Sequence, residues 1–202
     1  MKQQVVALSP ADALLATGAV VAIRPVVAAD EPELAALYRR ASRESMRRRF
    51  FSYSTIVGEE DVRRMVRPTV PNRLALAAVD RSGIVGVASL VRSGDTRQAE
   101  FALLVDDARH GEGIGTLRIE HGIAAARRLG YRRIHADVLA DNSAMLSVLH
   151  DLGVEPKMHT SSGVVEIDFP VPHRDTWRLA VQDRDSIAEH ASLSRLLAPA
   201  VI

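Results

Sequence analysis

Three short, apolar and β-rich runs follow one another in the middle of the sequence, and they restrict the fold more than any other feature. They occupy residues 74–79, 84–91 and 99–105, and Asp80-Arg-Ser-Gly83 between the first two has the composition of a tight turn. Strands that follow each other this closely pair antiparallel, because a parallel crossover needs a dozen or more residues. The sequence therefore predicts an antiparallel unit at the centre of a sheet.

Other elements are predicted on both sides of this unit. Asp30 is expected to cap a helix with Glu33 at its third position, and a second short helix should end before Pro68. The remaining predicted elements are a strand at 20–25, a helix at 111–129, a strand at 134–139, a helix capped by Asp141-Asn142-Ser143 and a strand at 164–169. This order predicts a mixed α/β domain of the α+β type, with helices flanking a mostly antiparallel sheet.

Composition excludes several classes of function. The 202 residues contain no cysteine, which rules out disulfides, thiolate nucleophiles and Cys-ligated zinc. The net charge of +1 favours neither nucleic acid nor an anionic membrane as a partner. No apolar run reaches the length of about 18 residues that a membrane span needs, and the N-terminus lacks the layout of a signal peptide. We expect a cytoplasmic protein.

The glycine-rich segment Arg109-His-Gly-Glu-Gly-Ile-Gly-Thr116, between a predicted strand and a long helix, indicates a site for phosphate. Glycines let the backbone approach a ligand, and a helix start offers unpaired N–H groups and a positive dipole end. A P-loop would need Gly-Lys-Ser/Thr here, and no lysine is present. A dinucleotide fingerprint would need a glycine at Arg118. A glycine-rich turn without a ligand stays an alternative.

The same segment matches the pyrophosphate loop of the GNAT N-acetyltransferases, Gln/Arg-x-x-Gly-x-Gly/Ala, at His110-Gly-Glu-Gly113-Ile-Gly115. Further stretches resemble the acetyltransferase domain of bacterial Pat-type protein lysine acetyltransferases, which is fused to a domain resembling an NDP-forming acyl-CoA synthetase. They are Ser42-x-Glu44-Ser45…Arg49-Phe50-Phe51-Ser52, Ala99-Glu100-Phe101-Ala102, Gly113-Ile-Gly-Thr116…Glu120-His121 and Asp141-Asn142-x-x-Met145. The resemblance implies a GNAT fold and acetyl-CoA as co-substrate, with no metal.

The candidate site residues follow from the chemistry of the side chains and from the resemblance to the GNAT family. Glu100 is the candidate general base: a carboxylate in an apolar strand is costly unless it has a task or a partner, and the resemblance points to the same position. A strand glutamate that faces solvent is the alternative. Without a cysteine, direct attack in a ternary complex is favoured over an acyl-enzyme. The resemblance assigns cofactor binding to Leu103, Leu104, Val105, Arg109, Gly111, Glu112, Gly113, Ile114, Gly115, Thr116 and Asn142.

Two positions depart from the family pattern. His110 stands where Gln or Arg is expected, although Arg109 could supply the charge. The tyrosine that serves as general acid in many GNAT enzymes corresponds to Leu149, so any acid is another group. Asn142 could equally be a plain helix cap. The arginines at 47–49 are interpreted as a solvated helix face, with docking of an acidic protein surface as the alternative, and the histidines as structural or surface residues.

The expected function is acetylation of a protein lysine, with an acyl-CoA synthetase as the implied target. A GNAT enzyme for a small amine and a non-catalytic acyl-CoA sensor are the alternatives. The expected organisation is an N-terminal appendage at 1–19, the acetyltransferase domain at 20–171 and a tail at 172–202 that leads toward a missing synthetase-like domain.

Overall fold

The computed structural model describes residues 10–15, 17–52, 54–67, 73–94, 97–151 and 156–172. The strands in these residues form one sheet in the order β1-β2-β3-β4-β5-β6-β8-β7, antiparallel except between β5 and β6. Their bounds are β1 Ala11–Leu14, β2 Val20–Pro25, β3 Arg73–Asp80, β4 Gly83–Arg92, β5 Gln98–Val105, β6 Arg133–Leu139, β7 Lys157–Ser161 and β8 Val164–Pro170.

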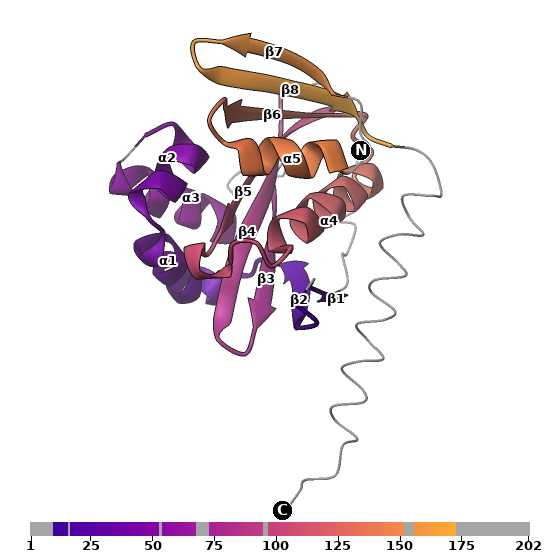
Figure 1. The fold of residues 1–202 in the computed structure, drawn as a ribbon. Helices are drawn as coiled ribbons and strands as arrows, with labels where there is room; N and C mark the ends of the chain where they lie inside the picture. Colours follow the sequence, from indigo (N-terminus) through magenta and orange to yellow (C-terminus); the bar gives the residue numbers. More distant parts are fainter. Residues whose placement is uncertain are drawn as a thin grey trace, which may run out of the picture.

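Five α-helices in the described residues cover the sheet from two sides (Figure 1). Helices α4 and α5 pack on one face, and the N-terminal helices α1–α3 pack on the other. Their bounds are α1 Glu31–Arg40, α2 Arg43–Phe50, α3 Thr55–Val66, α4 Ile114–Arg128 and α5 Ser143–Asp151. The predicted α/β architecture and the antiparallel unit β3-β4-β5 are confirmed.

The structure adds two edge strands that the sequence did not reveal. Strand β1 pairs antiparallel with β2, so part of the expected N-terminal appendage belongs to the sheet. Strand β7 pairs with β8 and has every residue exposed, so it lacks the apolar alternation by which strands are recognised. Strand pairing itself, which involves only the backbone, defines both elements. Residues 173–202 of the expected tail lie outside the described residues.

Asp30 precedes α1 as predicted, but its side chain does not cap that helix. Its carboxylate accepts hydrogen bonds from the guanidinium of Arg24, at 2.7 and 2.8 Å, and from the amide of Val27 at 2.8 Å. The bond from Arg24 is the main reason why the pKa of Asp30 lies below its usual range, although burial opposes the charged form. Asp30 therefore fastens the end of β2 to the start of the first helix.

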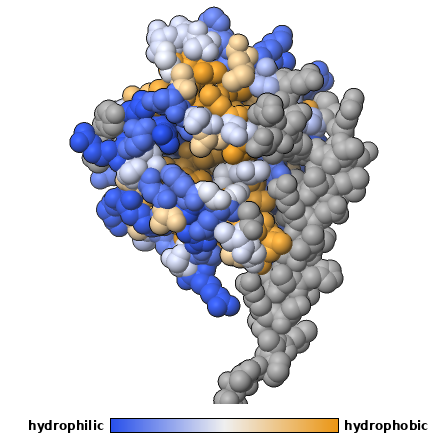
Figure 2. Space-filling model, in the orientation of Figure 1, coloured by the Kyte–Doolittle hydropathy of each residue, from blue (hydrophilic) through white to orange (hydrophobic). Residues whose placement is uncertain are grey.

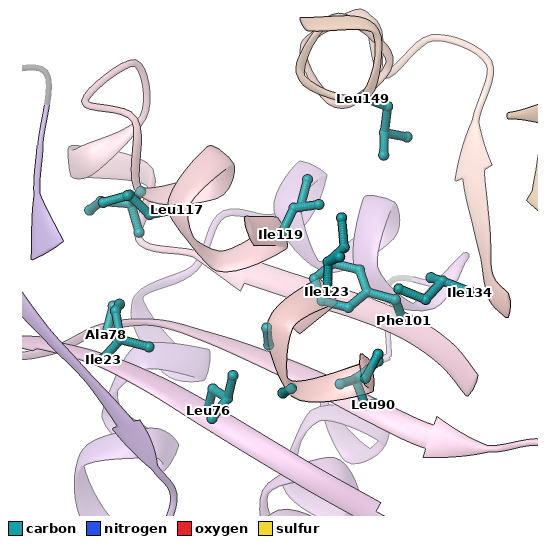
Figure 3. Close-up of a cluster of buried hydrophobic side chains, with 14 of the residues drawn as sticks. Ile23, Leu76, Ala78, Leu90, Phe101, Leu117, Ile119, Ile123, Ile134 and Leu149 are labelled. Atoms are coloured by element: carbon teal, nitrogen blue, oxygen red, sulfur yellow. The ribbon is translucent and has the colours of Figure 1, made fainter. Parts of the chain in front are cut away.

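Two apolar clusters fill the spaces between helices and sheet. The larger one joins α4 and α5 to the sheet, with the ring of Phe101 beside Ile123 and with Leu149 above it on α5 (Figure 3). The second cluster lies between α1, α3 and the middle strands, and includes Leu34, Leu37 and Tyr38 of α1. Strands β3, β4 and β5 thus have helices on both faces.

The sheet opens between its two parallel strands. Strand β5 pairs with β4 along its whole length, from Ala99 to Val105. It pairs with β6 only at 98–100, and the last matched residues are Glu100 and His135. Beyond this point the two strands diverge, and in Figure 1 β6, β8 and β7 lie across the top of the view while β3–β5 run steeply downward. The fork between β5 and β6 positions the candidate site.

Candidate active site

A cleft of about 390 Å³ occupies the fork between β5 and β6. Its walls are the diverging parts of these strands, the glycine loop with the start of α4, the start of α5 and one side of α2. Apolar surface is exposed in this central region, beside the hydrophilic surface of the N-terminal helices (Figure 2). A slot with apolar walls that ends at a helix N-terminus suits a long, flexible ligand with phosphates at one end.

The glycine loop has the backbone geometry of a phosphate cradle. Gly113 is the N-cap of α4 with φ of 90°, a left-handed conformation that L side chains rarely adopt. A side-chain carbon at Gly115 would meet no atom within 4 Å, and both glycines line the cleft. The first amides of α4 have no partner within the helix. Open space and unpaired N–H groups therefore face the cleft together.

The structure brings almost all of the predicted cofactor residues to this cleft. Those that line it are Leu103, Leu104, Val105, Arg109, Gly111, Gly113, Ile114, Gly115, Thr116 and Asn142. Their common feature is position on β5, on the glycine loop or at the start of α5. All but Asn142 belong to a single continuous stretch of chain, so their proximity follows largely from the order of the residues.

Glu112 does not line the cleft. Its carboxylate lies 2.8 Å from Nε of Arg109, and a second carboxylate, of Asp80, also binds the Arg109 guanidinium. These two acids raise the pKa of Arg109, with the Asp80 bond as the larger cause. The charge expected from Arg109 is thus already balanced by protein groups, and the loop offers its amides instead.

Glu100 lies at the start of the fork and does not line the cleft, whose wall on β5 begins with the next residue, Phe101. Its neighbour Phe101 points to α4, where its ring would clash with any side chain at Gly122, so Glu100 points to the opposite face. There the side chain is exposed. The argument from costly burial was wrong, because strand alternation places this carboxylate toward solvent. What distinguishes Glu100 is its place at the last residue where β5 and β6 still pair.

Helix α2 is fastened to the segment before the glycine loop by one carboxylate. Asp107 accepts the Ser42 amide at 2.8 Å and the hydroxyls of Ser42 and Ser45 at 2.7 Å each. Burial opposes the charge of Asp107, but the bonds from Ser45 and Ser42 outweigh it, so its pKa lies below the usual range. The two serines of the Pat-like stretch therefore hold α2 against the cleft, a role that the sequence alone did not reveal.

Two arginines of the run at 47–49 line the cleft, so their interpretation as a solvated face was wrong. The Arg49 side chain is only 10% exposed and its guanidinium donates to Asp61 at 2.8 Å and to Ser89 at 3.3 Å. Asp61 also binds Arg73 and the Tyr38 hydroxyl. This buried carboxylate draws Arg49 inward, and no local pattern in the sequence indicates it.

The other side of the cleft begins at α5. The Asn142 side chain accepts the Met145 amide at 3.3 Å, so Asn142 caps α5 and lines the cleft as well. Leu149, at the position of the missing tyrosine, is 3% exposed within the apolar core and cannot donate a proton (Figure 3).

Within the described residues no cluster of three potential ligands could hold a metal ion, and no helix is long and apolar enough to cross a membrane.

Comparison with protein families identifies this arrangement. A family model for the acetyltransferase (GNAT) domain matches residues 21–155, well over half of the chain. The chain belongs to the GNAT acetyltransferase family. Its members are N-acetyltransferases, so the predicted fold and enzyme class are confirmed.

Individual relatives point to one branch of the GNAT family. The GNAT domain of S. lividans PAT superposes with a TM-score of 0.73 and 32% identity, over 80% of this chain and 96% of that one. Acetyltransferase Pat of Mycolicibacterium smegmatis is 35% identical over 94 residues, which is 46% of this chain and 28% of that protein. The match thus spans little more than a quarter of that curated relative.

A more distant GNAT structure shares the fold. YncA of Salmonella typhimurium, solved with its cofactor acetyl-CoA, is 19% identical with a TM-score of 0.62, over 76% of this chain and 95% of that one. At this identity the likeness concerns the fold alone.

Proposed function

We propose that this domain transfers the acetyl group of acetyl-CoA to a lysine side chain of a protein, with Glu100 as general base and an acyl-CoA synthetase as acceptor. One observation carries the proposal: Glu100 lies at the apex of a fork whose cleft runs to a glycine-lined helix start. The likeness to Pat proteins supports a protein acceptor.

The residues present fit acetyl-CoA as donor. The amides at the start of α4 would hold the pyrophosphate, and the apolar walls of Leu103 and Val148 would contact the pantetheine arm. Strand β5 leaves β6 beyond Glu100, so its backbone on that side is open to hydrogen bonding with the arm and with a developing oxyanion. The structure of YncA with acetyl-CoA is consistent with this use of the fold.

The reaction requires a base because a lysine ammonium, with a pKa of about 10.4, is not a nucleophile at neutral pH. The Glu100 carboxylate takes one proton from the ammonium. The neutral amine then attacks the thioester carbonyl carbon, and the tetrahedral intermediate expels the thiolate of coenzyme A. Since the chain has no cysteine, the acetyl group passes directly from donor to amine in a ternary complex.

Replacement of Glu100 by glutamine tests the proposal. Glu100→Gln keeps the size of the side chain but removes the proton acceptor, so kcat should fall about 10²–10⁴-fold. The Kd of acetyl-CoA should stay within about twofold, because the donor contacts are made mainly by backbone. The measurement is transfer of radiolabel from acetyl-CoA to a purified acetyl-CoA synthetase, with calorimetric titration of acetyl-CoA in parallel.

A matched control is Glu166→Gln, which makes the same change at an exposed residue on the same face of the sheet. It should keep wild-type turnover. A Glu100→Gln variant with near-normal turnover would remove Glu100 from the mechanism. Wild-type protein that leaves the synthetase unlabelled would refute the proposed acceptor.

Donor binding is tested separately at the glycine loop. Gly113→Asp introduces a negative charge at the phosphate end and a side chain at a φ of 90°, so acetyl-CoA affinity should fall about 100-fold or more. Calorimetric titration measures the change, and circular dichroism checks that the variant is folded. Unchanged affinity in a folded variant would contradict the assigned site.

A further inference from the structure

Two side chains of β6 share the face and the position of Glu100. His135 is the residue matched with Glu100 at the apex of the fork, and the preceding pair, Ala99 and Ile134, is buried in the cluster beneath α4. Because side chains alternate along a strand, Glu100, His135 and Asp137 all point to the opposite face. Neighbouring strands lie about 4.8 Å apart, so the Glu100 and His135 side chains start as direct neighbours.

His135 connects this position to the cleft and to solvent. Its Nε2 lies 3.0 Å from Oδ1 of Asp137, and Asp137 lines the cleft. The His135 side chain is 31% exposed and that of Asp137 is 45% exposed. The described helices on this face pack against β3, β4 and β5, so water reaches this part of β6.

The proton balance of the proposed reaction leaves one proton on Glu100. The acceptor begins as an ammonium with three protons on nitrogen and ends as an amide with one. The leaving thiolate takes up one of the two protons lost. The other must reach solvent in every turnover, or the Glu100 carboxylate remains protonated and cannot act again. An imidazole is suited to this transfer because it ordinarily titrates near neutral pH.

We propose that His135 accepts from Glu100 the proton that the acceptor amine releases and passes it to water, while Asp137 holds the imidazole at the mouth of the cleft. This inference rests on the proposed function and adds a proton relay to it. No bond other than the exchanged N–H and O–H bonds is made or broken in the relay. His135 acts through Glu100 and is a relay residue.

The charges around His135 leave it available for this role. Asp168 of β8 is its matched neighbour on the other side, but Arg133 binds that carboxylate at 2.8 and 2.9 Å. The other acids near His135 on this face of the described strands are Glu100, its match on β5, Asp137 on its own strand and Glu166, the match of Asp137 on β8. His135 thus has the candidate base beside it on the neighbouring strand, and its ring contacts a carboxylate that borders the cleft.

The experiment compares His135→Gln and His135→Ala with wild type in acetyl transfer at pH about 7 and about 9. We expect kcat at the lower pH to fall about 10–100-fold while the KM of acetyl-CoA is unchanged. The deficit should shrink at the higher pH, where more of the acceptor amine is already neutral. Added imidazole, at tens of millimolar, should restore much of the rate of His135→Ala, because a free imidazole can occupy the space and carry the proton.

His159→Gln is the matched control, since His159 is an exposed histidine of β7 on the same face of the sheet. It should have wild-type turnover and no response to imidazole. Wild-type kcat in His135→Gln at both pH values would overturn the relay. A loss in His135→Ala that imidazole does not restore would also overturn it, because that loss would reflect structure alone.

Failure of the relay and failure of the proposed acceptor give different results. Each rate is measured with acetyl-CoA synthetase and with Nα-acetyl-lysine amide, whose ammonium has the same proton balance. If wild type acetylates only the small amine, the proposed protein acceptor is wrong and the His135 variants are judged on that amine. If wild type acetylates neither, both proposals are refuted.

Discussion

The two halves of the sheet on either side of the fork are built from different kinds of sequence. In β4, residues 84–90 are all buried, because helices cover both faces. In β6 and β8 buried and more exposed residues alternate, and in β7 every residue is exposed. Helices α4 and α5 bury one face of the second half, and polar side chains occupy the other.

Because of this difference, the residues that stabilise the fold and the candidate catalytic residues lie in different parts of the sheet. The covered half buries apolar side chains on two faces, which provides most of the free energy that holds the fold together. Glu100 on β5 and His135 and Asp137 on β6 lie at the border between the two halves, where water and neighbouring charges solvate them. The site lies where the two halves meet, with rigid backbone on one side and solvated side chains on the other.

The largest expected effect is a charge placed in the covered half. Val87→Asp puts a carboxylate at a residue that is 1% exposed between β3 and β5, with no partner of opposite charge among the described neighbours in its apolar cluster. We expect a loss of more than about 4 kcal/mol, which is comparable with the whole stability of many domains. Urea unfolding followed by circular dichroism should show no cooperative native state.

Two control variants distinguish the effect of the buried charge from the loss of apolar contacts and from a charge at an exposed residue. Val87→Ala removes apolar contacts without a charge and should cost about 1–3 kcal/mol. His159→Asp, in the open half, should change stability by less than about 0.5 kcal/mol. Equal losses in Val87→Asp and His159→Asp would contradict the distinction between the halves.

An intermediate effect is expected at Asp30, at the edge of the covered half. Asp30→Asn breaks the ion pair with Arg24 and should cost about 1–3 kcal/mol at neutral pH. The pKa of Asp30 is lowered in the folded protein, chiefly by the Arg24 bond, so its stabilising effect is present above the ordinary carboxyl pKa of about 3.9. That effect is lost as the pH falls through the lower folded value.

The difference in unfolding free energy between wild type and Asp30→Asn should therefore shrink on acidification from pH about 5 to about 2. Denaturation midpoints across this range measure it. Both proteins should still lose stability in acid, because Asp80 and Asp107 also have lowered pKa values. A difference that grows at low pH would contradict the ion pair.

The smallest effect is expected on the outer strands of the open half. Glu166 is exposed on β8, so Glu166→Ala should change the unfolding free energy by less than about 0.5 kcal/mol. It should also keep wild-type acetyl transfer, since Glu166 does not line the cleft and lies on β8, two strands away from Glu100. A larger loss by thermal or urea unfolding would show that the polar face contributes to stability and is not simply tolerant of change.

The sequence by itself determined the antiparallel unit β3-β4-β5, the glycine loop and the helix that follows it. Local patterns indicate these features: apolar runs, turn residues and glycines such as Gly113, which has a left-handed backbone conformation. Together with the resemblance to the GNAT family, they led to most of the candidate residues that line the cleft, because β5, the loop and α4 are continuous in the chain. The edge strands β1 and β7 were missed, since backbone pairing leaves little trace in short or fully exposed segments.

Only the tertiary structure decided which side chains surround Glu100. The match of Glu100 with His135 depends on the parallel register that the α4 crossover brings about, and the register then stops at the fork. The same holds for Asp107, whose bonds to Ser42 and Ser45 join segments more than 60 residues apart. The physical reason is the same in each case. A side chain's neighbours across strands or between helices depend on how distant segments pack, and local periodicity carries no record of that packing.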